Sequence, residues 1–185
     1  MIYVVTMPGA LGALKNKGSF IRPDVQAAAW DLHITTRFMN NENPTSPQAR
    51  TFARKGDRRG RALLLCGKSM GGIKVTEYVL KRVWQEFGGY DKLAHYTVDA
   101  YGMGYGKGQV RGNLELPGDL VRNKDYFKAI NLYQRSRGFE GALVHGAENH
   151  KLDRFPDGKK VDHMNIVEHP AIEEYAKVLL EWLVK

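Results

Sequence analysis

The chain has 185 residues, which is enough for one domain of ordinary size and too few for two comfortable ones. It carries 28 Lys and Arg against 20 Asp and Glu, a formal net charge of +8, and 43% of its residues are hydrophobic, which excludes a disordered chain. The single cysteine, Cys66, excludes an internal disulfide framework and a four-cysteine zinc site.

The amino-terminal residues bear on where the protein works. Residues Met1–Met7 hold no basic segment, and their apolar stretch is too short for a signal peptide. No apolar run reaches the roughly 18 residues of a transmembrane helix. We therefore expect one domain over residues 1–185, located in the cytoplasm, with a basic surface.

Strands and helices are expected to alternate along the chain. Apolar and β-branched runs predict strands at Ile2–Met7, Ile34–Met39, Ala62–Cys66, Ala94–Ala100, Phe127–Gln134 and Ala142–Gly146. Helical periodicity and proline placement predict helices at Pro23–Leu32, a short one from Ser46 as N-cap, one from Met70 to Phe87, and one over Ile172–Leu183. This alternation predicts an α/β fold with a mostly parallel sheet flanked by helices on both faces. Sites in such sheets form at the carboxyl ends of the strands.

A Gly-x-Ser-x-Gly motif stands at the end of the third expected strand. Gly67-Lys68-Ser69-Met70-Gly71 follows a buried strand and precedes an amphipathic helix. A serine on such a sharp turn needs small neighbours, and the turn exposes its hydroxyl above the sheet. The motif therefore predicts that Ser69 is a nucleophile. The same residues end a phosphate-loop pattern, but Ala62 stands where that pattern requires glycine.

The chain resembles the lipase and serine-esterase branch of the α/β-hydrolase superfamily, as a minimal, lid-poor member. The resemblance extends over nearly the whole length and is most specific at residues 65–72 and 161–166. The family commonly has His or Tyr where Lys68 stands. The resemblance implies a Ser, acid, His order, with the histidine in a loop before the last helix.

His163 is the base that this order favours. It lies in the expected loop Asp157–Asn165, between the last expected strand and the final helix. His150 is the alternative because it also follows that strand, and His169 is expected at the entry of the helix.

Asp99 is the acid that we favour, because it ends the strand that comes after the elbow helix, the helix that begins at Met70 behind the Ser69 turn. In most of the superfamily the acid follows the next strand, but lipases resembling the pancreatic type carry it here. The next strand is followed by no carboxylate before Glu140. Asp162 and Glu148 are the alternatives, and Asp162 is interpreted as a hydrogen-bonding loop residue.

The backbone N–H groups of Met70 and Ala10 are expected to form the oxyanion hole. The glycine-rich stretch 102–108 follows a strand but starts no amphipathic helix, so a dinucleotide site is not expected. It is interpreted as a loop that borders the site, where Tyr101 and Met103 contact substrate. No cofactor is expected, and because the histidines lack metal-ligand spacing, no metal either.

A cluster of basic residues precedes Ala62–Cys66, the expected strand that leads to the Ser69 turn. Its members are Arg50, Arg54, Lys55, Arg58, Arg59 and Arg61. The cluster is interpreted as a solvated helix face, with attraction to an anionic surface as the alternative. Aromatic residues are not interleaved with it, so no specific nucleic-acid partner is expected.

Together these features predict a serine hydrolase that cleaves a carboxylic ester, with a small molecule or a lipid ester as substrate. Thioesters and amides remain open. The alternative is a catalytically silent α/β-hydrolase-like protein that uses its basic face to bind an anionic partner.

Overall fold

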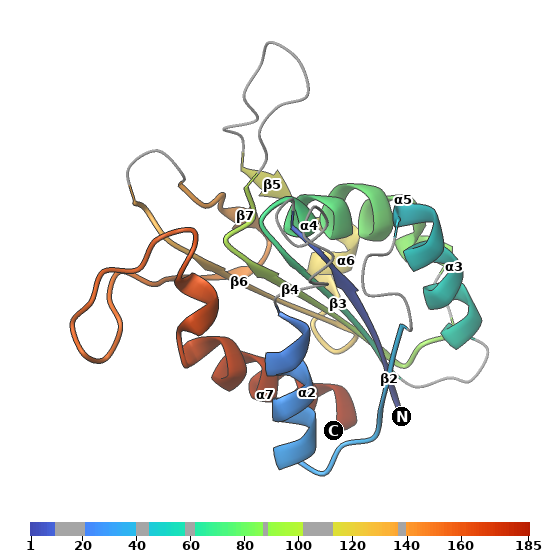
Figure 1. Cartoon of the computed structure of the whole chain (residues 1–185). Coiled ribbons are helices and arrows are strands. Elements are labelled where there is room, and N and C mark those ends of the chain that lie inside the picture. Colours follow the sequence, from blue (N-terminus) through green and yellow to red (C-terminus); the bar gives the residue numbers. More distant parts are fainter. Residues whose placement is uncertain (10–20, 40–44, 58–61, 87–88, 102–112, 137–139) are drawn as a thin grey trace.

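Six parallel strands form the central sheet, as the computed structural model in Figure 1 shows. The structure describes residues 1–9, 21–39, 45–57, 62–86, 89–101, 113–136 and 140–185. The strand order is β2-β1-β3-β4-β6-β8. The strands are β1 (Ile2–Met7), β2 (Thr36–Phe38), β3 (Ala62–Lys68), β4 (Lys92–Val98), β6 (Phe127–Tyr133) and β8 (Glu148–Lys151).

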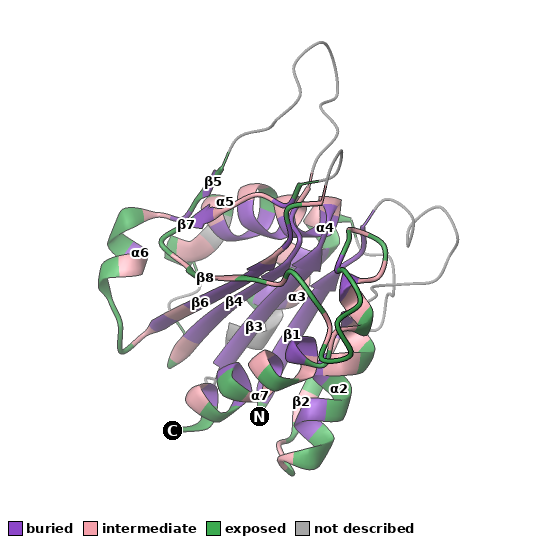
Figure 2. Cartoon of the chain, turned by 90° about the vertical axis from the view of Figure 1, so that its left-hand side faces the viewer, coloured by how far each residue is buried: buried purple, intermediate pink, exposed green. Residues whose placement is uncertain are grey.

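Helices cover both faces of this sheet. Strands β1 and β3 are buried along their whole length, and alternate side chains enter two separate cores. Ile2 and Val4 face α2 (Arg22–Asp31) and α7 (Ala171–Val184), whereas Tyr3 and Val5 face the side of α3 (Ser46–Asp57) and the elbow helix. Figure 1 shows the two helical layers, and Figure 2 shows the buried sheet between them. The expected α/β fold, with a parallel sheet flanked on both sides, is confirmed.

The helix after β3 departs from the regular α-helix that its periodicity predicts. It runs as α4 (Met70–Ile73), a π-helical stretch (Lys74–Leu80), α5 (Lys81–Val83) and a 3₁₀ turn (Trp84–Glu86). The Thr76 hydroxyl donates to the Gly72 carbonyl at 2.8 Å, and that carbonyl is the one that the Thr76 amide would use in an α-helix. A side-chain hydroxyl therefore competes with the backbone at the start of the π-helical stretch.

The prediction of the last strand was wrong. Within Ala142–Gly146, only β7 (Val144–His145) forms, and it pairs with β5 (Leu114–Glu115) outside the main sheet. The last strand of the main sheet is β8, whose sequence Glu-Asn-His-Lys gives no apolar signal. The side-chain amide of Asn149 helps to hold β8 against its neighbours, because it forms hydrogen bonds with the Asn131 side chain and with the backbone N–H and carbonyl of Val144.

The start of α3 is one residue earlier than expected. Thr45, and not Ser46, forms the cap: the Thr45 amide donates to Gln48 Oε1 at 2.9 Å, and the Gln48 amide donates to Thr45 Oγ1. The helix has 12 residues and is not short, and the short helix α6 (Gly118–Arg122) was not predicted.

Within the described ranges, no helix combines the length and apolar character that crossing a membrane requires.

A fully buried histidine lies between β4 and the elbow helix. His95 Nε2 is 2.9 Å from the Thr76 hydroxyl, which already donates its own proton to Gly72, so the Nε2 nitrogen must be the donor. His95 Nδ1 is buried without a hydrogen-bond partner in the described part of the chain. Burial lowers the pKa of His95 to about 3, and the imidazole is therefore neutral.

This histidine makes the stability of the fold depend on pH. An unfolded chain protonates a histidine near its ordinary pKa of 6.5, whereas folded His95 stays neutral down to about pH 3, so the unfolded state binds more protons between these values. The contribution of neutral His95 is therefore complete above pH 6.5. We expect the free energy of unfolding to fall by roughly 1.4 kcal/mol per pH unit through this group as the pH drops toward 3.

Urea unfolding of the wild type and of His95→Gln between about pH 7.5 and 4.5 measures this slope. The glutamine amide can still donate to Thr76 but does not titrate. The wild type should lose stability more steeply than the variant. Asp24, whose pKa burial raises to about 6, is common to both proteins and cancels in the comparison. Equal slopes in the two proteins would contradict the assignment.

Candidate active site

Ser69 occupies a strained turn between β3 and the elbow helix. Its backbone has φ 53° and ψ −127°, a conformation that residues with a Cβ atom rarely adopt. The Ser69 amide donates to the Val98 carbonyl at 3.1 Å, and the Ser69 carbonyl accepts from the Gly72 amide at 3.0 Å. The surrounding structure therefore holds the serine in this conformation from both sides.

Two glycines make this turn possible. A Cβ on Gly67 would lie 2.3 Å from the Gly71 carbonyl oxygen, and a Cβ on Gly71 would lie 2.1 Å from the Met7 carbonyl oxygen. Both distances are shorter than any non-bonded contact. Glycine at these two positions is therefore required by the close approach of β1, β3 and the helix, as the Gly-x-Ser-x-Gly pattern predicts.

Ser69 lies where the connections of the sheet diverge. The loops after the neighbouring strands β1 and β3 lead to opposite sides, and such a switch point opens a crevice at the carboxyl ends of a parallel sheet. A Cβ on Gly9 would be 3.7 Å from Ser69 Oγ, so the loop after β1 borders the hydroxyl. Met70 begins the helix, and the first amide groups of a helix have no partner within it. Ala10 lies outside the described residues.

Asp99 and His163 form a close pair at the same edge of the sheet. His163 Nδ1 is 2.6 Å from Asp99 Oδ2, Asp99 is fully buried, and the His163 side chain is 13% exposed. A carboxylate only accepts hydrogen bonds, so Nδ1 carries the proton and Nε2 of the neutral ring is left as a base. These two residues, 64 positions apart in the sequence, are brought together by the fold.

Two residues that sequence reasoning missed hold Asp99 in place. The backbone N–H of Gln134 donates to Asp99 Oδ1 at 3.3 Å. The side-chain amide of Gln134 donates through Nε2 to Asp99 Oδ2 at 3.0 Å. Gly141 leaves room for the carboxylate, because a Cβ there would be 2.0 Å from Asp99 Oδ1. Gln134 directly follows β6, where the family resemblance places the usual acid, and that vacant position was the available signal.

The Ser69 hydroxyl and His163 are not hydrogen-bonded to each other in the described part of the chain. The structure therefore brings Asp99 and His163 together and places Ser69 at the same edge of the sheet, without a hydrogen bond between Ser69 and His163. In enzymes without substrate, such bonds are often long and tighten only when substrate binds. Tyr101 packs against His163, with ring centroids 5.5 Å apart, and Met103 lies outside the described residues.

The alternative residues have other contacts. His150 lies on β8 with Nδ1 2.9 Å from the Tyr175 hydroxyl, and His169 accepts from the Ala171 amide at the start of α7. Glu148 is exposed beside Lys128, and Asp162 accepts from two amides of its own turn. None of these contacts joins the pair of Asp99 and His163.

Lys68, beside the serine in the motif, is buried. It is 5% exposed, and burial lowers its pKa, while the carboxylates of Asp99, Asp162 and Glu168 raise it. Burial is the larger effect. A cation in this position adds positive potential next to the Asp99 carboxylate.

Cys66, on the same strand, is fully buried, and burial raises the pKa of its thiol, so it is an unreactive packing residue.

The two arginines of the basic cluster whose side chains are described, Arg50 and Arg54, form hydrogen bonds within the protein. Arg50 donates to the Tyr78 carbonyl at 3.1 Å, and Arg54 binds Glu86 at 2.8 Å, so both arginines tie α3 to the elbow helix. The side chains of Lys55, Arg58, Arg59 and Arg61 lie outside the description. Among the described residues, no group of three His, Cys, Asp or Glu side chains could hold a metal ion.

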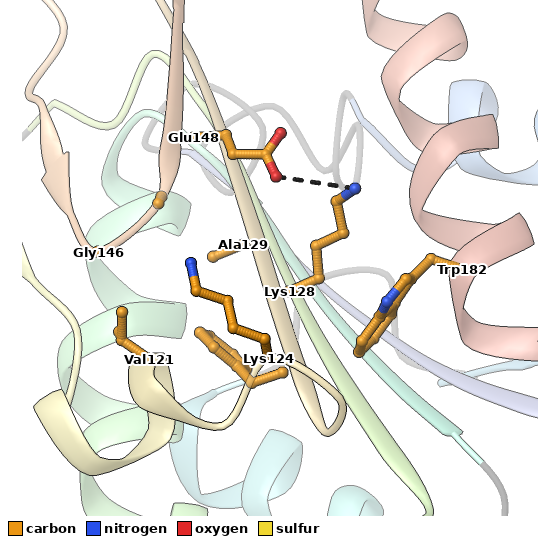
Figure 3. A pocket seen from close by; sticks show the side chains of 9 residues that line it. Val121, Lys124, Lys128, Ala129, Gly146, Glu148 and Trp182 are labelled. Carbon is orange, nitrogen blue, oxygen red and sulfur yellow. Dashed lines mark ion pairs between the residues drawn. The ribbon is translucent and has the colours of Figure 1, made fainter.

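A cavity of about 410 Å³ lies at the opposite end of the sheet. It is bounded by the start of β6, the segment before β8, and Trp182 of α7. Figure 3 shows Lys124 and Lys128 reaching into it, with Lys128 ion-paired to Glu148 at 3.7 Å. Because it adjoins the amino ends of the strands, this cavity is not part of the site around Ser69.

Comparison with solved structures identifies the type of fold. The chain is similar to a proposed hydrolase of the alpha/beta superfamily from Xanthomonas campestris pv. campestris, with a TM-score of 0.54. The chain has an α/β-hydrolase type of fold. The two sequences are 9% identical, and the match covers 97% of this chain and 98% of the other. No model of a known protein family matches the sequence, and no curated protein matches it.

Gly141, the glycine beside Asp99, gives a test of the geometry in this α/β-hydrolase fold. Gly141→Ala places a methyl group 2.0 Å from Asp99 Oδ1, so the carboxylate must move and its hydrogen bond to His163 must weaken. We expect the free energy of unfolding to fall by about 1–3 kcal/mol. In proton NMR spectra, the downfield Nδ1–H resonance of His163 should shift or disappear.

Gly118→Ala is the matched control, because a Cβ there meets only Arg122 Nη1 at 3.5 Å. It should leave the His163 resonance unchanged. A folded Gly141→Ala protein with the wild-type resonance would contradict the proposed packing of Asp99.

Proposed function

We propose that the protein is a serine hydrolase of carboxylic esters in which Ser69 is the nucleophile, His163 the base and Asp99 the acid. The observation that carries the proposal is the backbone of Ser69. For a non-glycine residue, the combination of φ 53° and ψ −127° costs roughly 1–3 kcal/mol, and backbone strain of this kind clusters at active sites. The Asp99–His163 pair at the same edge of the sheet supports it.

In the proposed reaction, His163 Nε2 takes the proton of the Ser69 hydroxyl as its oxygen attacks the acyl carbon. Asp99 fixes the ring with Nδ1 protonated and stabilises the imidazolium that forms. The amides of Met70 and Ala10 then donate to the oxyanion of the tetrahedral intermediate. His163 gives its proton to the leaving alcohol, and an acyl-enzyme remains on Ser69.

Water completes the cycle in the second half. His163 again acts as base, the hydroxide attacks the acyl carbon, and Ser69 leaves with the proton held by the imidazole. Tyr101, packed on the His163 ring, and Met103 are proposed to contact substrate. This chemistry belongs to the lipase and serine-esterase branch that the sequence resembles.

A silent binding protein is the competing proposal, and it would need the basic face free for a partner. Arg50 and Arg54 instead contact the elbow helix. The described contacts therefore favour the enzyme.

Labelling with a fluorophosphonate tests the nucleophile. The wild type should be modified at Ser69, as peptide mass spectrometry would locate, and Ser69→Ala should not react while retaining the wild-type circular dichroism spectrum. A folded wild-type protein that fails to react would overturn the proposal.

The acid is tested by substitution at three carboxylates. Asp99→Asn should lower kcat by about 10⁴-fold, because the amide favours the wrong tautomer of His163. Glu148→Gln and Asp162→Asn are the controls, since their contacts do not reach His163. A nearly unchanged rate in Asp99→Asn, with either control inactive, would assign the acid to that control residue instead.

A further inference from the structure

A second cavity lies beside the proposed catalytic pair. It has a volume of about 450 Å³ and is lined by Arg135, Ser136, Asp153, Arg154, Lys160 and Val161. Arg135 and Ser136 follow β6, and the other four belong to the segment after β8. Both strands end at the edge of the sheet that carries Ser69 and Asp99.

Two cations of this cavity stand directly opposite each other. Residues 153–161 form a small hairpin in which Arg154 and Lys160 are paired across an antiparallel bridge. The Phe155 amide donates to the Lys159 carbonyl, the Val161 amide donates to the Asp153 carbonyl, and Gly158 turns the chain at φ 86°. Side chains directly opposite in such a bridge lie on the same face, and like charges there are destabilising. A bound anion would remove this repulsion.

The other charges of the cavity are already matched. Arg135 pairs with Glu140 at 3.3 Å, and Asp153 pairs with Lys151 at 3.0 Å. Within the described ranges, neither Arg154 nor Lys160 has a carboxylate partner. Arg154 uses only one of its five donors, toward the Gly158 carbonyl at 2.9 Å. The cavity therefore presents two solvent-exposed cationic groups for which the described residues supply no carboxylate partner.

The cavity is connected to the acid and the base by short links. The Ser136 amide donates to Gln134 Oε1, and the other end of that amide side chain donates to Asp99. Val161 lies two residues before His163 in the same loop. The cavity is therefore linked to Asp99 through the Gln134 side chain and to His163 through two residues of the chain.

The sheet order places the cavity relative to the serine. Ser69 ends β3, Asp99 ends β4, and the cavity follows β6 and β8, which lie further along the sheet. Two strand spacings separate β3 from β6, or about 10 Å. In the proposed mechanism the leaving alcohol faces His163, and we therefore expect the alcohol part of the substrate to extend along the sheet from Ser69 past Asp99 toward the cavity.

We propose that Arg154 and Lys160 bind a carboxylate or phosphate group on the alcohol part of the ester, so that the substrates are esters of anionic alcohols. This inference rests on the proposed serine hydrolase activity for its substrate class. The anion site itself does not depend on that activity. In the cavity of Figure 3, by contrast, one of the two lysines, Lys128, is paired with Glu148, and the site lies at the opposite end of the sheet.

Calorimetric titration with succinate and with inorganic phosphate tests the anion site apart from catalysis. The titration uses the full-length Ser69→Ala protein, which keeps the cavity residues and cannot turn over. We expect binding of at least one anion, and the added substitutions Arg154→Gln and Lys160→Gln should each raise the dissociation constant about tenfold. Added Lys159→Gln is the matched control: it removes the same charge from the same hairpin, but its ammonium lies over the Phe155 ring, 5.5 Å from the centroid.

Kinetics with the active enzyme test the substrate class. The substrates are butyrate esters of phenols with a para carboxylate on linkers of increasing length, each compared with the matching carboxamide. The wild type should prefer the carboxylate at one linker length. Arg154→Gln and Lys160→Gln should lower the carboxylate-to-carboxamide ratio of kcat/KM about tenfold, and Lys159→Gln should leave this ratio unchanged.

The two experiments fail separately. Absence of anion binding, or equal weakening by Lys159→Gln, would overturn the anion site. Anion binding at the site without any preference for the carboxylate esters would overturn the proposed substrate class. The anion site would then stand, but without a role in binding the alcohol part of the ester. No turnover and no fluorophosphonate labelling, with anion binding intact, would overturn the serine hydrolase and not the site.

Discussion

The contact on which the site depends is the approach of Gly71 to the Met7 carbonyl. At this point the elbow helix lies against the end of β1, and a single methyl group would separate them. The same closeness draws Gly9 to within reach of the Ser69 hydroxyl and fixes the left-handed backbone of the serine. Strand β3, buried on both faces, supplies a rigid base for this arrangement. The geometry of the proposed nucleophile is thus set by backbone packing at two strand ends.

The proposed acid is positioned in a different way, by hydrogen bonds from several elements. Asp99 also has a left-handed backbone, and its amide donates to the Leu132 carbonyl at 2.6 Å. Its carboxylate is bound by Gln134 and His163, so β4, the end of β6 and the loop before α7 converge on one buried charge. A buried carboxylate without such partners would be strongly unfavourable. These groups therefore offset the burial of Asp99 and orient the imidazole at the same time.

The sequence predicts those parts of the protein in which local pattern and global fold agree. The apolar run of β3, the glycines around Ser69 and the apolar stripe of α7 all led to elements that the structure has. Strand β8 could not be predicted, because Asn149 attaches it through side-chain hydrogen bonds instead of apolar burial. The contacts of Gln134 depend on Asp99, a partner distant in sequence, and the Thr76 hydroxyl, which bonds Gly72 in the π-helical stretch, also contacts the distant His95. Long-range pairs of this kind leave no periodic signal.

Both open edges of the sheet are poor templates for further strands. An edge strand presents unpaired backbone groups that can recruit another chain, and proteins blunt such edges with short length and charge. At one edge, β2 spans three residues and carries the exposed Arg37. At the other, β8 spans four residues and presents Glu148 and Lys151 to solvent. The polar sequence of β8, which gives no strand signal, thus also protects the sheet from edge-to-edge aggregation.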